Sequence, residues 1–484
     1  MISSYKGHLE VTDYLCKMGC DLNRSNYQAV TALHAAAAEN HLLIVQCLTK
    51  NGAIINKNSK GLTPLSEAAM NLNLSIVDYF TDDTLNLFSQ LQCIEAFELL
   101  ATSYAGYFVD NSNIEKIYEY LLKAMQLRYS DPNKPILKIV LPPSEMYENH
   151  IECNTLEELK LIQFNVDSLF METFVVRERI LGSQHEALIP NLLYIGAVYA
   201  DQKKFDRCFS LWLRALDVKK SNSELKIDDF LRFAGVFDEM YHEDGGDFPF
   251  NVYMVVLRNI IQELISMKYK SKSFNLLTVL YLIVIIAKVM ILKTTNEKIE
   301  ICNLIYHLNS YNFKTDNGST LLHLCVNENT PVNTIHFKFP CSFGAKLLID
   351  NGADVNAVDR VGNTPLHIIA RSDECTNENR NEMLTIVSDL IHNDAHIDTV
   401  NDDGQTPLDC AQVEQMRLIL RSQTKLSLKC ITARTVIMLD LNYSKHLSKA
   451  LIDFVKLHSI VNNIKNFRFL LILSNVLKYF WDGY

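Results

Sequence analysis

Apolar residues recur along most of this chain at spacings of three and four, the period of a helix packed on one side. The segments 43–48 and 205–216 are clear examples, whereas nothing in residues 94–220 alternates as a half-buried strand would. The chain has only 16 Gly and 11 Pro among 484 residues, so it has few turn signals for its length. This pattern predicts an all-α fold.

One layout recurs at both ends of the chain. Gly19-Cys20-Asp21-Leu22-Asn23 returns as Gly52-Ala53-Ile54-Ile55-Asn56, 33 residues later. Further copies of this segment lie at residues 352–356 and, more weakly, 395–398. Thr-x-Leu-x segments follow them at residues 31–34, 63–66, 364–367 and 406–409, with a degenerate copy at 320–323. A 33-residue period with Thr-Pro-Leu-His opening a helix is the signature of the ankyrin repeat.

Each position in this layout has a physical role. The Thr is expected to cap the first helix of its repeat, with Pro in the first turn, where no amide partner is needed. Gly52 and Gly352 are expected to end a second helix at positive φ. His34, His323 and His367 occupy equivalent positions, so we expect them to hydrogen-bond the adjacent loop rather than to bind a metal ion.

The middle of the chain also predicts paired helices. Residues 191–200 and 205–216 match a tetratricopeptide unit in outline, with small residues at Gly196 and Ala200 and an aromatic-rich second helix. Arg177-Glu178-Arg179 places opposite charges side by side, which we interpret as a solvated helix face that ends at Gly182.

These patterns divide the chain into six segments. They are residues 1–83, N-terminal ankyrin repeats in an incomplete set; 84–222, a tetratricopeptide-like helical region; 223–315, a further helical region; 316–424, C-terminal ankyrin repeats; 425–457, a docking box; and 458–484, a tail of uncertain role.

The segment 276–292 is strongly apolar. It falls short of the ~20 residues that a membrane-spanning helix needs, and Lys288 interrupts it. We therefore expect a fully buried helix, with a membrane anchor as the alternative. The acidic segment 242–247 lacks the ligand spacing of an EF-hand, so we interpret it as a flexible loop rather than a calcium site.

Charge and cysteine usage narrow the function. The net charge of −10 disfavours bulk nucleic-acid binding. The 12 cysteines contain no Cys-x-x-Cys pair, which disfavours a zinc ribbon, a redox dithiol and a disulfide framework. The N-terminus lacks a signal-peptide layout. No catalytic motif is present, so we expect no enzyme activity, no cofactor and no metal site.

The last segment carries two short amphipathic patterns. After Ser427, a candidate cap, Leu428, Thr432 and Val436 follow at i, i+4 and i+8, which forms one stripe of a helix. Leu447, Leu451 and Phe454 form a second stripe. Such stripes suit insertion into a partner's groove. The alternative is a cap of the solenoid, which periodicity alone favours.

A resemblance to known docking motifs favours the partner-docking interpretation over the solenoid cap. Ser-Leu-x-x-x-(small)-x-x-x-Val is similar to the BC-box that docks on elongin C, and the second stripe resembles a cullin-2 box; together they resemble a VHL-box. With two ankyrin blocks around a tetratricopeptide-like middle, roughly residues 2–458 resemble the feminization-1 (fem-one) homologue family. Stretches that agree include Tyr5-Lys6-Gly7-His8, Val140-Leu141-Pro142-Pro143, residues 176–182 and 196–201, and Ser427-Leu428-Lys429-Cys430.

The resemblance implies a non-catalytic substrate receptor of a cullin-2 RING ubiquitin ligase, cytoplasmic or also nuclear. Its implied partners are elongin B/C, cullin-2 with its RING subunit, and substrates bearing C-terminal degrons, with no nucleic acid and no membrane. The implied elongin C contacts are Leu428, Cys430, Thr432 and Val436, and the implied cullin-2 contacts are Leu447, Leu451 and Phe454.

This chain departs from the family in two ways. The family begins with more ankyrin repeats, which hold most of its degron pocket, so we expect a truncated N-terminus and assign no degron-binding residues. Thr432 replaces the usual Ala or Cys, and Ser448 stands where the cullin box carries proline. Elongin docking is therefore expected to survive better than cullin-2 selectivity. The alternative is a truncated paralogue or scaffold that binds elongin C but no degron.

Overall fold

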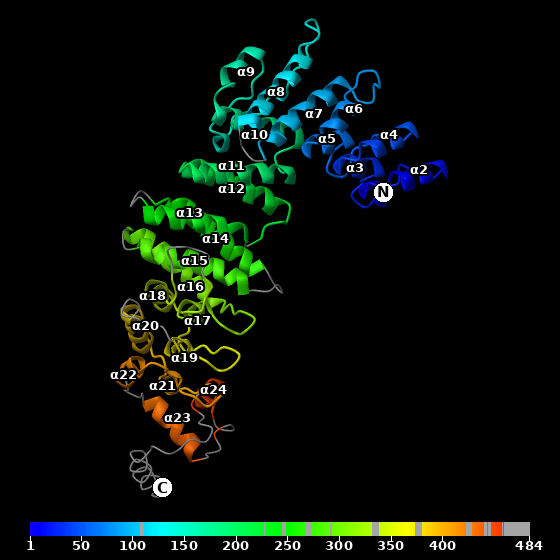
Figure 1. Cartoon of the computed structure of the whole chain (residues 1–484). Coiled ribbons are helices and arrows are strands. Elements are labelled where there is room, and N and C mark those ends of the chain that lie inside the picture. The colour runs from blue at the N-terminus through cyan, green and yellow to red at the C-terminus, as the bar shows by residue number, and fades with distance from the viewer. Residues whose placement is uncertain are drawn as a thin grey trace, which may run out of the picture. The chain divides into compact units, whose positions relative to one another are not determined.

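A computed structural model of the chain shows helices throughout its described part (Figure 1). The structure describes residues 1–106, 111–226, 228–243, 248–266, 273–290, 293–331, 338–372, 380–422, 428–439, 443, 447–456 and 458. Every element in these ranges is an α- or 3-10 helix, which confirms the all-α prediction. The chain separates into two compact units, Met1–Leu225 and Lys226–Tyr484.

Unit 1 is a series of helix pairs in which α3, α5 and α7 pack in turn on one another. Its elements are α1 (Ile2–Tyr5), α2 (Leu9–Lys17), α3 (Ala32–Ala38), α4 (Leu42–Lys50), α5 (Pro64–Met70), α6 (Leu74–Phe80), α7 (Gln90–Tyr104), α8 (Asn111–Arg128), η1 (Glu145–Tyr147), α9 (Leu156–Ile162), α10 (Val166–Leu181), η2 (Glu186–Leu188), α11 (Ile189–Asp201) and α12 (Phe205–Ser221).

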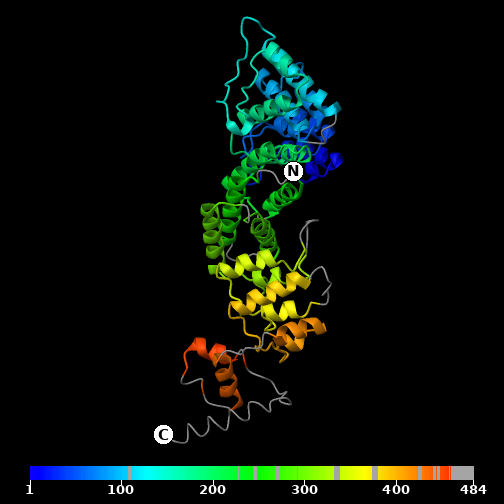
Figure 2. The same ribbon diagram turned by 90° about the vertical axis from the view of Figure 1, so that its left-hand side faces the viewer.

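Unit 2 continues in the same style, with α15, α18 and α20 in consecutive contact and α17, α19 and α21 in another. Its elements are α13 (Asp228–Glu243), α14 (Phe250–Ser266), α15 (Ser273–Val289), α16 (Thr295–Ser310), α17 (Leu321–Cys325), α18 (Ser342–Asp350), α19 (Pro365–Ala370), α20 (Arg380–His392), α21 (Pro407–Cys410), α22 (Glu414–Ser422), α23 (Leu428–Met438) and α24 (Lys449–Lys456). The last two pack against each other (Figure 2).

The predicted start and stop signals are where the sequence placed them. Thr31 and Thr320 accept a hydrogen bond from the backbone N–H three residues on, and Thr364 forms the same capping box with His367. Gly52 and Gly352 adopt φ of +82° and +84°, a conformation that glycine reaches without steric cost.

The three equivalent histidines join one repeat to the next, as predicted. The backbone N–H of Thr31 donates to His34 Nδ1, so His34 Nε2–H donates to Leu62 O, 3.1 Å away. His323 reaches Asn363 O at 3.0 Å and His367 reaches Gln405 O at 3.1 Å in the same way. Burial lowers the pKa of all three rings, to about 4 for His367, which keeps them neutral.

The pair α11 and α12 shows why a glycine stands at position 196. Trp212 Nε1 donates to Leu193 O at 3.0 Å, which brings the indole ring onto α11. A Cβ added at Gly196 would lie 2.4 Å from Trp212 Cδ1, closer than any side chain tolerates. The assignment of this region as a tetratricopeptide unit stays a prediction.

A buried ionic network fills the centre of unit 1, and it corrects one expectation. Arg179 pairs with Glu98 Oε2 at 2.7 Å and with Glu152 Oε2 at 2.9 Å, and Arg128 pairs with Glu98. Arg177 is only 5% exposed and donates to Ala187 O and to Thr102 and Ser103. The interpretation of 177–179 as a solvated face is therefore wrong, although the helix does end at Gly182.

The carboxylates of this network can be buried because cations beside them neutralise their charge. Burial by itself would raise the pKa of Glu152, but Lys138 and Arg179 hold it below its usual range. Lys138 Nζ lies 2.8 Å from Glu152 Oε1, and the lysine side chain is itself buried. Each carboxylate in the network thus has a cation beside it, as buried charges require.

The apolar segment 276–292 forms the core of unit 2. Helix α15 is buried on nearly all sides: each side chain from Val279 to Ile286 is at most 1% exposed. Helices α13, α14, α17 and α18 pack around it, which confirms the buried-helix prediction for the described positions. No helix among the described residues has both the length and the apolarity to cross a bilayer. Of the predicted flexible loop 242–247, His242 and Glu243 instead form the end of α13, and residues 244–247 lie outside the described residues.

Replacing His367 with Ala should lower the free energy of unfolding by about 1–3 kcal/mol, because it leaves a buried carbonyl and a helix cap without their partner. Urea denaturation followed by circular dichroism measures the change. His392→Ala is the matched control, since His392 ends α20 in the same repeat with an exposed ring that bonds only Ser388. Equal midpoints for the two variants would contradict the inter-repeat role.

Replacing Arg179 with Met should destabilise unit 1 by about 3–5 kcal/mol, because Glu98 and Glu152 lose a shared buried cation. Thermal unfolding measures the loss. The control is Lys116→Met, which breaks an exposed pair with Glu119 that is worth about 1 kcal/mol or less. If both variants melt alike, the network contributes no more than a surface pair does.

Candidate functional site

Helix α23 presents two different faces. Cys430 and Ala433 are both 3% exposed, whereas Thr432 is exposed and Val436 is half-buried. Because successive residues turn by about 100° around a helix, Thr432 and Val436 share a side that lies opposite Cys430. The stripe that is predicted to dock on a partner therefore does not lie on the buried side of α23.

The inward side of α23 touches the C-terminal ankyrin block. Cys430 Sγ lies 3.1 Å from Nδ1 of His396, a residue of the loop between α20 and α21. The structure therefore gives the Cys430 thiol a contact inside unit 2. The prediction that Cys430 also contacts elongin C stays a prediction, as do those for Thr432 and Val436. The side chain of Leu428, like Ser427, lies outside the described residues.

Part of the apolar stripe of α24 packs on the same residue of the ankyrin block, His396. The ring of Phe454 stands edge-on to His396 with 5.0 Å between the ring centroids, and it lies 4.7 Å from His458. Val455 is buried, whereas Leu451 is 50% exposed and Leu447 is half-buried. Of the predicted cullin-2 contacts, Leu451 is therefore the most accessible, and Phe454 is engaged in packing.

A groove of about 560 Å³ runs along the loops of the C-terminal ankyrin block and reaches α24. Both signs of charge line it, from Lys314 and Lys456 and from Asp354, Asp402 and Asp453. Its volume is typical of ligand pockets, about 300–1,000 Å³. No sequence motif predicts this groove, because its walls come from loops about 40 residues apart in the chain.

Two groups of described side chains have donor atoms close enough to share a metal ion. One lies where the final helices meet the ankyrin block: His396, Asp398, Cys430 and His458. The other lies in unit 1: His150, Cys153 and Glu172. Sequence reasoning missed both, because it looked for ligands at short spacing.

Comparison with known proteins gives a consistent result. A family model described as "Ankyrin repeats (3 copies)" matches residues 1–89. The human protein fem-1 homolog C is 32% identical over 442 residues, which cover 86% of this chain and 68% of that protein. The mouse protein fem-1 homolog A-like is 28% identical in an alignment 521 residues long. That alignment covers 95% of this chain and 76% of the mouse protein.

Fish relatives agree: fem-1 homolog A of Danio rerio is 30% identical over 439 residues, covering 84% of this chain and 67% of its own length. Among solved structures, the human ASB11 ankyrin repeat domain aligns with 88% of this chain and 97% of its own length. That alignment has 11% identity and a TM-score of 0.21, which is too low to support an argument.

Replacing Phe454 with Ala should loosen α24, because the ring supplies its contact with His396. Hydrogen exchange read by mass spectrometry should show faster exchange of backbone amides in residues 449–456. Leu451→Ala is the matched control on the same helix, since Leu451 is half exposed. Unchanged exchange in Phe454→Ala would mean that the ring does not hold the helix.

Proposed function

Because the chain belongs to the fem-1 family, we propose that it is the non-catalytic substrate-recognition subunit of a cullin-2–elongin B/C RING ubiquitin ligase. The observation that carries the proposal is the stripe of Leu428, Thr432 and Val436 on a helix directly after the last ankyrin repeat. This is where the family resemblance puts the BC-box. Membership itself rests on 32% identity over 442 residues.

The exposure of α23 supports docking. The face with Thr432 and Val436 is at least partly accessible, and the opposite face is held on the ankyrin block through Cys430. A partner can therefore approach the stripe without displacing that anchor. An apolar helix face laid into a complementary groove is a common mode of protein recognition.

The mechanism in this proposal is positioning. The receptor holds a substrate at one end and the ligase core at the other, so that ubiquitin transfer from a separate enzyme becomes effectively intramolecular. The proposed substrates are proteins with C-terminal degrons, and their binding residues in this chain are unassigned. The alternative is a scaffold that binds elongin C but no degron. Binding of a degron peptide to the purified chain would exclude it.

Replacing Leu428 with Asp should abolish co-purification with elongin B/C, because it sets a charge on the first apolar position of the docking stripe. Pull-down with purified elongin B/C measures the loss, and it should exceed about tenfold in affinity. Leu418→Asp, at a 57% exposed leucine of α22 outside the box, is the control. Elongin retention by Leu428→Asp would exclude this mode of docking.

A further inference from the structure

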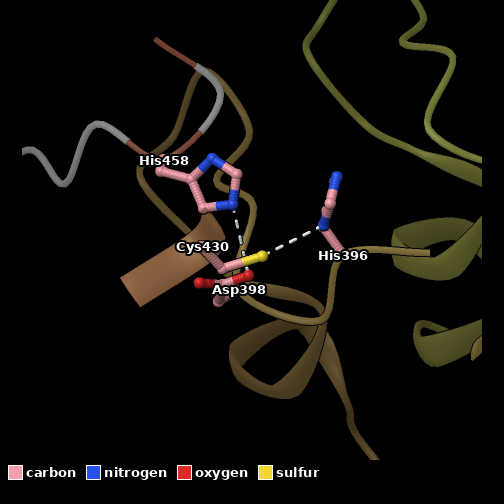
Figure 3. A group of neighbouring side chains, drawn as sticks. All are labelled: His396, Asp398, Cys430 and His458. Carbon is pink, nitrogen blue, oxygen red and sulfur yellow. Dashed lines mark hydrogen bonds and ion pairs between the residues drawn. The ribbon is translucent and has the colours of Figure 1, made fainter. Parts of the chain in front are cut away.

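Four side chains from three segments converge where the final helices meet the ankyrin block (Figure 3). The loop after α20 supplies His396 and Asp398, α23 supplies Cys430, and His458 follows α24. Cys430 Sγ lies 3.1 Å from His396 Nδ1, and His458 Nε2 lies 3.4 Å from Asp398 Oδ1. All four donor atoms lie within 4.8 Å of one another.

Three of the four members of this cluster are buried, and His396 is half-buried. Asp398 and Cys430 are each 3% exposed and His458 is fully buried. A carboxylate removed from water to this extent needs positive charge close by. The group that faces Asp398 across the cluster is the imidazole of His458.

The hydrogen bond at Nδ1 of His458 determines the tautomer of the ring, and therefore whether Nε2, which faces Asp398, carries a hydrogen. Nδ1 lies 2.8 Å from Phe454 O, and since a carbonyl only accepts, Nδ1 carries the hydrogen. In the neutral ring Nε2 then presents a lone pair toward the carboxylate, and two acceptors at 3.4 Å repel each other. A cation on or between them, either a proton or a metal ion, removes this repulsion.

The proton is the competitor. Burial lowers the pKa of His458, but Asp398 and Cys430 outweigh it and raise that pKa to about 9. The second half of the cluster favours the metal, because Cys430 and His396 add a sulfur and a nitrogen ligand beside the first pair. A proton on His458 serves Asp398 and Cys430, whereas a metal ion can bind all four donor groups at once.

The donor set and its spacing suit zinc. Zn²⁺ prefers four tetrahedral ligands among Cys, His and carboxylate, and bonds of about 2.0–2.3 Å place neighbouring donors about 3.3–3.6 Å apart. The two measured separations, 3.4 and 3.1 Å, are close to that range. The bond from His458 Nδ1 to Phe454 O is the outer-shell contact that typically orients a metal-bound histidine.

The second group of donors behaves differently. His150 Nε2 lies 2.8 Å from Glu172, and Cys153 contributes its backbone N–H to the same carboxylate at 3.1 Å. Lys138 Nζ stands 3.9 Å from Glu172 and supplies the positive charge. A lysine thus occupies the role that a metal would have, so this group carries no metal proposal.

We propose that His396, Asp398, Cys430 and His458 form a structural zinc site that holds α23 and α24 against the C-terminal ankyrin block. The site joins the loop of one repeat to both helices that follow the last repeat. Its function is to set the position of the box helices. The inference stands independently of the proposed ligase role, because its test measures metal binding and not elongin.

The test is a titration of the full chain with Co²⁺ after removal of metal by a chelator. The site predicts intense visible d–d bands of tetrahedral cobalt and a near-ultraviolet thiolate-to-cobalt charge-transfer band. Zinc should then displace cobalt and abolish both. Elemental analysis of protein purified without chelator should find zinc retained through dialysis.

Cys430→Ser should remove the charge-transfer band, and His458→Ala should weaken zinc binding more than about 100-fold, because losing even an outer-shell partner costs about 10–100-fold. The matched control is Cys410→Ser, at a buried cysteine of the same ankyrin block, which should keep the full spectrum. Circular dichroism of each variant verifies folding.

The parent protein keeps the proposal falsifiable even if a variant fails to fold. Absence of tetrahedral cobalt bands in the parent would mean that the four donor groups hold no metal ion, and would overturn the proposal. Bands that persist unchanged in Cys430→Ser would place the metal elsewhere, with the same consequence.

Discussion

The hydrogen bond from a buried histidine to the carbonyl of the next repeat's loop is the interaction on which the ankyrin blocks depend. His34, His323 and His367 each accept from their own capping Thr backbone and donate forward, so each of these three first helices is completed by its neighbour. A repeat of this size cannot bury its own apolar face, and stability accumulates from such interfaces. The last Thr-x-Leu-x segment of each block lacks this histidine.

Ser66 and Asp409 stand at those two final positions, and each bonds back to its own capping Thr. Neither side chain can reach forward, and neither block continues as an ankyrin repeat. The chain beyond must be held by other contacts. After α6 these come from the apolar packing of α5 on α7. After α22 they come from Phe454 and from the cluster of His396, Asp398, Cys430 and His458. The proposed structural metal ion would meet this need.

The sequence predicted those features whose cause is local. Caps, turn glycines, the inter-repeat histidines and the buried helix at 276–292 all follow from spacing within about one repeat. The buried network of unit 1 escaped prediction because Arg179 finds its partners 27 and 81 residues away in Glu152 and Glu98. Adjacent opposite charges look the same whether solvent or a distant carboxylate surrounds them. The cluster around Cys430 was missed for the same reason, since no Cys-x-x-Cys pair marks it.

The two faces of α23 connect the fold with the proposed function. One face anchors through Cys430 and leaves the opposite stripe accessible, as the proposed docking on elongin C requires. Light scattering coupled to size-exclusion chromatography of the chain mixed with elongin B/C and cullin-2 tests this most directly. The account predicts one stable complex containing elongin B/C, with cullin-2 bound more weakly because Ser448 replaces the box proline. Elution of the chain apart from elongin B/C at micromolar concentration would contradict it.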